Sequence, residues 1–165
     1  MRLITSPNRP DFNSRRFFTI FLGGSIDMGA AEDWQVKLAS DLSGYDDDLV
    51  LFNPRRLQWD ASLPQDPTPG TTFHYQVAWE FEYQDESNIN VYYFGDNSPA
   101  PISLLELGSY GTEFPYQTVV RCSPNFYRYG NVNMFCKKHG ITLVHTYDEL
   151  LNVLKYRIDK EFYHG

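Results

Sequence analysis

The sequence contains few cysteine and histidine residues, and this limits the disulfide and metal chemistry open to it. Its 165 residues include two cysteines, Cys122 and Cys136, and four histidines. No C-x-x-C motif occurs, so no disulfide framework is predicted. The histidines have no zinc-binding spacing with each other or with the cysteines, and we therefore expect no metal site. Free thiols suit a reducing compartment, which favours a cytoplasmic protein.

The sequence also lacks long apolar runs and an excess of positive charge. No run approaches the roughly 20 apolar residues that a membrane span requires. The N-terminal stretch MRLITSPNRP lacks the apolar centre of a signal peptide. The chain has 14 Lys and Arg against 21 Asp and Glu, a net charge of −7. An acidic surface repels phosphate backbones and anionic lipids, so neither a nucleic acid polymer nor a membrane is expected as a partner.

Apolar and aromatic residues, by contrast, are plentiful. Hydrophobic residues make up 42% of the chain and aromatic residues 16%, which is enough for the core of one domain of ordinary size. Residues 1–16 are polar and include two prolines, so they predict an N-terminal arm. Residues 17–165 are expected to form a single domain. Many of the tyrosines should be half-buried, with the ring packed and the hydroxyl hydrogen-bonded.

Short apolar runs alternate with amphipathic segments along this domain. The apolar runs predict buried strands and the amphipathic segments predict helices. This alternation indicates an α/β fold of flavodoxin-like or Rossmann-like type, doubly wound, with a five-stranded, mostly parallel sheet flanked by helices. Ligands of such folds lie at the carboxyl ends of the strands. The expected strands are 17–24, 49–54, 88–94, 116–122 and 141–145, and the expected helices are 30–42, 73–84, 101–110, 131–139 and 147–158.

Two strand ends carry candidate binding residues. The first strand runs into GGSID, residues 23–27, whose glycines either let the backbone approach a ligand or form a tight turn between strand and helix. The second strand runs into NPRR, residues 53–56. Its adjacent arginines either grip a carboxylate or phosphate, or form ion pairs with acidic residues of the same chain.

Glu106 stands among apolar residues in the stretch PISLLELG. Ile102, Leu105 and Ser109 fall on one helical stripe, and Glu106 lies beside that stripe, close to the body of the protein. A carboxylate at an apolar boundary needs a reason, because its burial is costly. Either it is catalytic, or it occupies a surface position at the helix boundary.

The stretch QVAWE, residues 76–80, combines amide and aromatic side chains on an expected helix. These side chains suit stacking on a nucleobase and recognition of its amide groups. A tryptophan buried in the core is the alternative interpretation.

Taken in order, these blocks resemble the nucleoside 2-deoxyribosyltransferase-like family. The matching stretches extend over residues 17–154 and are FLGGSID with the following DWQ, FNPRR, F-x-x-Q-x-x-WE, NVYYF with the following SPAPISLLELG, and FYRYGNVN. The resemblance implies a pentosyltransferase of nucleotide salvage that transfers the sugar of a 2′-deoxynucleoside to a free nucleobase. It implies no cofactor, and it implies a homo-oligomer.

The resemblance also assigns roles to individual residues. Glu106 would be the nucleophile that forms a covalent deoxyribosyl intermediate, with Ser103 one helical turn earlier orienting its carboxylate. Asp27 would contact the sugar or the base. The remaining positions would bind the substrate: Gly23, Gly24 and Ser25 at the sugar, Asn53 and Arg55 at the mouth of the site, and Gln76 and Trp79 near the base.

One position departs from the family pattern. An aspartate associated with the base is expected where this chain has Asn90, and a neutral amide cannot act as a general acid. Either Asp27 protonates the leaving base or the base leaves with less help. The departure keeps a non-catalytic nucleotide sensor as an alternative.

The outcome of the reaction also remains open between transfer and hydrolysis. The aromatic-rich loops indicate a covered site, which favours transfer. A deoxynucleoside 5′-monophosphate N-glycosidase is a further alternative, in which Arg55, Arg56 and the GGS turn would hold the phosphate.

Overall fold

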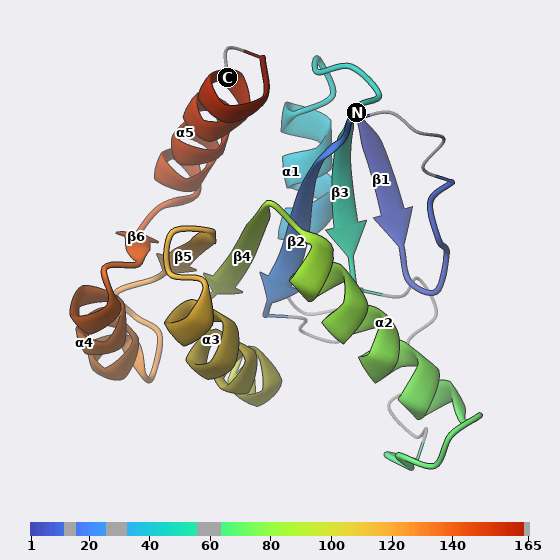
Figure 1. Ribbon diagram of the computed structural model, residues 1–165. Helices are drawn as coiled ribbons and strands as arrows, with labels where there is room; N and C mark the ends of the chain where they lie inside the picture. The colour runs from blue at the N-terminus through green and yellow to red at the C-terminus, as the bar shows by residue number, and fades with distance from the viewer. Residues whose placement is uncertain (12–15, 26–32, 56–63, 164–165) are drawn as a thin grey trace.

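The computed structural model describes residues 1–11, 16–25, 33–55 and 64–163. These residues form one sheet in which every neighbouring pair of strands is parallel, in the order β1-β3-β2-β4-β5-β6 (Figure 1). The predicted doubly wound α/β architecture is confirmed, with six strands in place of the five expected. The strands are β1 (Arg2–Thr5), β2 (Phe18–Gly24), β3 (Leu49–Asn53), β4 (Ile89–Phe94), β5 (Thr118–Cys122) and β6 (Thr142–Val144).

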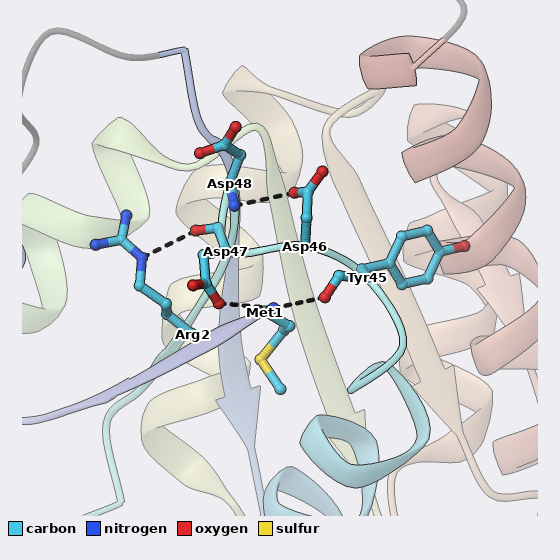
Figure 2. Close-up of polar contacts among 6 residues, drawn as sticks. All are labelled: Met1, Arg2, Tyr45, Asp46, Asp47 and Asp48. Carbon is cyan, nitrogen blue, oxygen red and sulfur yellow. Dashed lines mark hydrogen bonds and ion pairs between the residues drawn. The ribbon is translucent and has the colours of Figure 1, made fainter.

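The additional strand, β1, lies within the segment expected to be an arm. It forms the edge of the sheet beside β3, and all of its residues are half-buried. Its N-terminal end is tied to the loop before β3, because the main-chain nitrogen of Met1 donates to the Tyr45 carbonyl (2.6 Å) and Arg2 Nε donates to the Asp47 carbonyl (2.9 Å; Figure 2). A run this short, with polar residues on both sides, gave too little apolar pattern to be identified as a strand.

Helices cover both faces of the sheet. They are α1 (Trp34–Asp41), α2 (Thr72–Glu86), α3 (Pro101–Glu113), α4 (Tyr129–His139) and α5 (Tyr147–Ile158), the last continued by a π-helical segment, Asp159–Tyr163. All five expected helices are therefore present, with ends shifted by a few residues. Among the residues described, no helix combines the length and apolar character needed to cross a bilayer.

The alternation of side chains along β2 divides the core into two layers. Ile20 and Leu22 pack in the cluster that contains residues of α1 and α5. Phe21 points the other way, into the cluster that contains residues of α2. Residues of α3 and α4 share a third cluster with the same face of β4 and β5 that carries Tyr92. Helices α2, α3 and α4 therefore lie on one face of the sheet, and α1 and α5 lie on the other (Figure 1).

The strand order reverses between β2 and β4. From β2 the chain continues to β3 on one side, whereas from β4 it continues to β5 and β6 on the other. Ligands of doubly wound sheets bind beyond the strand ends at such a point. Here the ends of the two strands are in register, with Gly24 opposite Tyr93. Helix α3, which carries Glu106, follows β4 directly.

Candidate active site

Glu106 lies on the inner face of α3. The helix begins at Pro101, whose fixed φ angle suits a first turn, as predicted. The Glu106 side chain is only 8% exposed and shares the buried face with Ser103, Leu107 and Tyr110. The expectation that this carboxylate lies close to the body of the protein is confirmed. It also removes the surface alternative for Glu106, because a carboxylate at a solvated helix boundary would be exposed.

The apolar stripe beside Glu106 does not face the core. Ile102 and Leu105 are 60% and 71% exposed. The reason lies one turn further along, where Gly111 brings α3 close to its neighbours. A Cβ atom at Gly111 would stand 2.9 Å from Cδ1 of Ile141. This close approach fixes the helix with its other face inward and leaves Ile102 and Leu105 in solvent.

One residue from another element holds the Glu106 carboxylate, and a second residue holds the first. Gln84, on α2, donates from Nε2 to Glu106 Oε1 at 2.9 Å. Tyr92, on β4, donates from its hydroxyl to Gln84 Oε1 at 2.7 Å. The Tyr92 and Gln84 side chains are almost fully buried, with residue exposures of 0% and 1%. A continuous chain of hydrogen bonds therefore runs from the sheet through α2 to the carboxylate on α3.

The electrostatic environment favours the neutral form of Glu106. Burial and, to a smaller extent, the negative charge of Glu80 raise the pKa of Glu106, the hydrogen bond from Gln84 opposes the rise, and the net result is a pKa of about 8. Glu80 lies on α2 one helical turn before Gln84. Two carboxyl groups in different environments are a recurrent arrangement for acid–base and nucleophilic chemistry.

Gln76, Glu80 and Gln84 are spaced four residues apart on α2 and form a polar row. Gln76 is the member of this row nearest the strand ends. Its Nε2 donates to Glu80 Oε1 (2.5 Å) and to the Pro54 carbonyl (3.0 Å). Its Oε1 accepts from the Ser6 hydroxyl (2.6 Å), just beyond β1. Gln76 therefore belongs to the same row as Glu80, and it links the ends of β1 and β3 to α2.

Asn90 lies near the start of β4 and is 1% exposed. Its Nδ2 donates to the main-chain carbonyl of Gln84 at 3.0 Å, and its buried Oδ1 has no hydrogen-bond partner. Asn90 therefore reaches the Glu106 carboxylate only through Gln84, whose main chain it anchors.

The GGS turn closes the ends of β2 and β4. A Cβ atom at Gly24, where φ is +136°, would stand 2.4 Å from the Tyr93 carbonyl oxygen, so only glycine fits there. At Gly23 a Cβ atom would come within 3.1 Å of the Tyr92 ring. Ser25 donates from its main-chain nitrogen to the Tyr93 carbonyl (2.7 Å), and its hydroxyl accepts from the Gly95 nitrogen (3.1 Å). The glycines therefore serve close packing between strands, which accounts for them without a ligand.

Asn53 and Arg55 lie at the end of β3. Asn53 Oδ1 accepts from the main-chain nitrogen of Arg55 at 2.9 Å and shapes the turn. The Arg55 guanidinium stands 3.4 Å from the carboxylate of Asp33, the residue that caps α1. Of the two alternatives for Arg55, an ion pair within the chain is the one observed. The other candidates at these loops, Asp27 and Arg56, lie outside the described residues.

Trp79 is a core residue. It is 1% exposed and packs against Phe52 and Tyr83, while its Nε1 donates to the Asn8 carbonyl at 2.9 Å. It also forms one wall of a surface hollow of about 280 Å³ whose other walls are Pro7, Arg9, Thr72 and Tyr75. None of the residues that line this hollow belongs to the row Gln76, Glu80 and Gln84 or to α3.

Sequence reasoning did not identify Glu80, Gln84 or Tyr92 as functional residues. A signal was present for two of them, since Gln76, Glu80 and Gln84 recur at every fourth position and so form one polar row on α2. What the sequence could not supply was the partner that the row faces. Within the part of the chain that the structure describes, no group of His, Cys, Asp or Glu is arranged to hold a metal ion.

Comparison with known proteins agrees with the resemblance drawn from the sequence. A family model described as nucleoside 2-deoxyribosyltransferase like matches residues 18–126. These residues include Glu80, Gln84, Tyr92 and Glu106. No curated protein matches the chain.

Proposed function

The chain belongs to the nucleoside 2-deoxyribosyltransferase-like family, and we propose that it transfers the sugar of a 2′-deoxynucleoside to another nucleobase through a covalent bond to Glu106. The family consists of enzymes of pentosyl transfer that act on nucleosides. The observation that carries the proposal is the Glu106 carboxylate itself, which is 8% exposed and hydrogen-bonded by Gln84 at 2.9 Å. We propose that the reaction takes place in the cytoplasm.

The reaction proceeds in two displacements at the anomeric carbon. A Glu106 oxygen forms a bond to C1′ as the C1′–N bond breaks, and the electron pair of that bond leaves with the base, which takes up a proton. A nitrogen of the second base then attacks C1′, gives up its proton to the group that protonated the first base, and releases Glu106 as the carboxylate. A buried carboxylate suits the first step, because it stabilises an oxocarbenium-like transition state at close range. The absence of the electron-withdrawing 2′-hydroxyl makes this cation easier to form.

Two carboxyl groups are candidates for the proton that the leaving base requires. Asp27 is the one considered from the sequence in place of Asn90. Glu80 is the one that the geometry favours, because it belongs to the polar row on α2 that reaches Glu106 through Gln84, and it would act in its protonated form. Asn90, in contrast, donates its amide to the main chain of Gln84. A neutral amide at position 90 therefore leaves the proton transfer to one of these carboxyl groups.

The charge around Glu106 favours a nucleoside over its 5′-monophosphate. Helices α2 and α3 contain no lysine or arginine, and besides Glu82, which is ion-paired with Arg9, they carry the carboxylates of Glu80, Asp85, Glu86, Glu106 and Glu113. A phosphate dianion would be repelled in this environment. Arg55, one of the two arginines considered for a phosphate, stands beside Asp33.

A product assay tests the proposal. The protein is incubated with a deoxynucleoside, with and without a second free base, and the products are separated by chromatography. Transfer predicts a new deoxynucleoside that forms only with the second base, and a Glu106→Gln variant that forms none. Free deoxyribose in both reactions would assign hydrolysis instead. Tight binding without any product would assign a sensor, and full activity of Glu106→Gln would refute the role of this carboxylate.

We also propose that the protein is a homo-oligomer. The exposed side chains of Ile102 and Leu105 lie on α3, the helix of Glu106, and Phe81 on α2 is 51% exposed. Ile102 and Leu105 stand one helical turn apart, and apolar side chains exposed side by side are typical of contact surfaces. Light scattering should give a mass that is a multiple of 19.2 kDa, and Leu105→Asp should reduce it to that of the monomer. A wild-type mass of 19.2 kDa would contradict this proposal.

A further inference from the structure

We propose that Gln84 and Tyr92 form a positioning pair, which holds the Glu106 carboxylate in a single orientation for attack on C1′. This inference rests on the proposed role of Glu106 as nucleophile. Gln84 touches the carboxylate and Tyr92 acts through Gln84, so neither residue has to contact the substrate. Gln84 lies on α2 and Tyr92 on β4, so the pair reaches Glu106 from two elements other than its own helix.

The hydrogen bonds fix which way the Gln84 amide faces. Its Nε2 lies 2.9 Å from Glu106 Oε1 and 3.2 Å from the Glu80 carbonyl, and both of these atoms are acceptors. Its Oε1 lies 2.7 Å from the Tyr92 hydroxyl, which has a proton to donate. The reversed amide would bring its oxygen against two acceptors. The only polarity that satisfies every group therefore directs a donor at Glu106.

The main chain of Gln84 is held as firmly as its side chain. Its carbonyl accepts from Asn90 Nδ2 at 3.0 Å. The three residues Gln84, Asn90 and Tyr92 are each 1% exposed or less. Burying polar groups is costly unless they are paired, and apolar residues would fill this space at lower cost. Asn90 and Tyr92 both bond to Gln84, which holds the carboxylate, and this arrangement indicates a role beyond packing.

The same arrangement predicts how the pair affects ionisation. The titratable groups that face Glu106 are Glu80 on α2, Tyr92 on β4 and Tyr110 on α3. Burial and the charge of Glu80 raise the pKa of Glu106, whereas the hydrogen bond from Gln84 lowers it. Removing Gln84 should therefore raise the pKa of Glu106 further and leave less of the attacking carboxylate at neutral pH.

The first test measures activity against pH. Gln84→Met keeps the length of the side chain and removes the donor. We expect kcat to fall about 10- to 100-fold at pH 7 with KM little changed, because a hydrogen bond to a charged group is lost. The rising limb of the kcat/KM profile should move to higher pH. Tyr92→Phe, which removes only the hydroxyl, should move the limb in the same direction by less.

Ser87→Ala is the matched control. It removes another buried hydrogen bond at the end of α2, from the Ser87 hydroxyl to the Tyr83 carbonyl (2.6 Å), which does not involve Glu106. A purely structural role for Gln84 predicts that Gln84→Met and Ser87→Ala lower the amount of folded enzyme and leave the pH profile in place. That result would overturn the positioning proposal.

A second measurement separates this proposal from the proposed function. Carbon-13 NMR of labelled glutamate carboxyls follows the titration of Glu106 directly, with its signal identified by its absence in Glu106→Gln. Tyr92→Phe and Gln84→Met should raise the titration midpoint even if no reaction is found. An unchanged midpoint in both variants refutes the pair, whereas an inactive wild type with shifted midpoints refutes only the transferase assignment.

Discussion

At the scale of single residues, the fold stabilises the neutral form of Glu106, whereas the proposed reaction needs its ionised form. Its pKa is raised from the ordinary value of 4.5 to about 8, chiefly by burial. The folded state therefore binds the proton more tightly than the unfolded state does. The stability gained from this preference is complete below pH 4.5 and is lost as the pH rises through about 8. An enzyme that needs the ionised form must accept this loss.

The first prediction concerns this pH dependence. Glu106→Gln is neutral at every pH and still offers an oxygen to Gln84. We expect the variant to match the wild type near pH 5 and to be more stable at pH 9, with a difference that approaches roughly 4–5 kcal/mol, since one pKa unit corresponds to about 1.4 kcal/mol. Urea unfolding at both pH values measures it. An equal difference at the two pH values would show that Glu106 is not buried as described.

The second prediction concerns the neighbouring carboxylate. The charge of Glu80 raises the pKa of Glu106, so Glu80→Gln should lower it. The rising limb of kcat/KM against pH should then shift to lower pH, opposite in direction to the shift for Gln84→Met. If Glu80 also protonates the leaving base, kcat for poor leaving groups should fall more than kcat for good ones. If the rising limb of kcat/KM lies at the same pH in Glu80→Gln and in the wild type, the two carboxylates do not interact.

At the scale of elements, the positions of the strands and helices could be predicted from the sequence more successfully than the contacts between them. Strands such as β2 and β3 are mostly apolar, and each residue of both is buried, so pattern alone was sufficient. The strand β1 was missed because an edge strand of four residues carries little pattern. Glu106 was identified from its apolar neighbours in sequence. Gln84 and Tyr92 were not, because their role depends on how α2 and β4 meet α3, which no local pattern encodes.

The third prediction tests the join between β2 and β4. Gly24 has a φ of +136°, and a Cβ atom there would stand 2.4 Å from the Tyr93 carbonyl oxygen. Gly24→Ala should destabilise the fold by roughly 3 kcal/mol or more, because backbone strain and a backbone clash coincide. Gly44→Ala is the control, since a Cβ atom at that position meets nothing within 4 Å. Equal midpoints of chemical unfolding for the two variants would contradict this description of the turn.

At the scale of the whole molecule, the distribution of charge bears on the choice of substrate. The net charge is −7, and α2 and α3 contribute acidic residues without a lysine or arginine. Long-range repulsion of this kind weakens with salt, because the Debye length falls from about 10 Å at 0.1 M to about 3 Å at 1 M ionic strength. Repulsion by the protein's charge and steric exclusion of a phosphate can therefore be told apart.

The fourth prediction follows from this difference. The ratio of kcat/KM for a deoxynucleoside to that for its 5′-monophosphate should exceed one at low salt and should fall as salt is added, because only the monophosphate is repelled. The rate with the uncharged nucleoside should change little and serves as the internal control. A ratio that is independent of salt would assign the discrimination to the shape of the site. A ratio below one would mean that cations outside α2 and α3, such as Arg55 released from Asp33, bind the phosphate and outweigh the acidic helices.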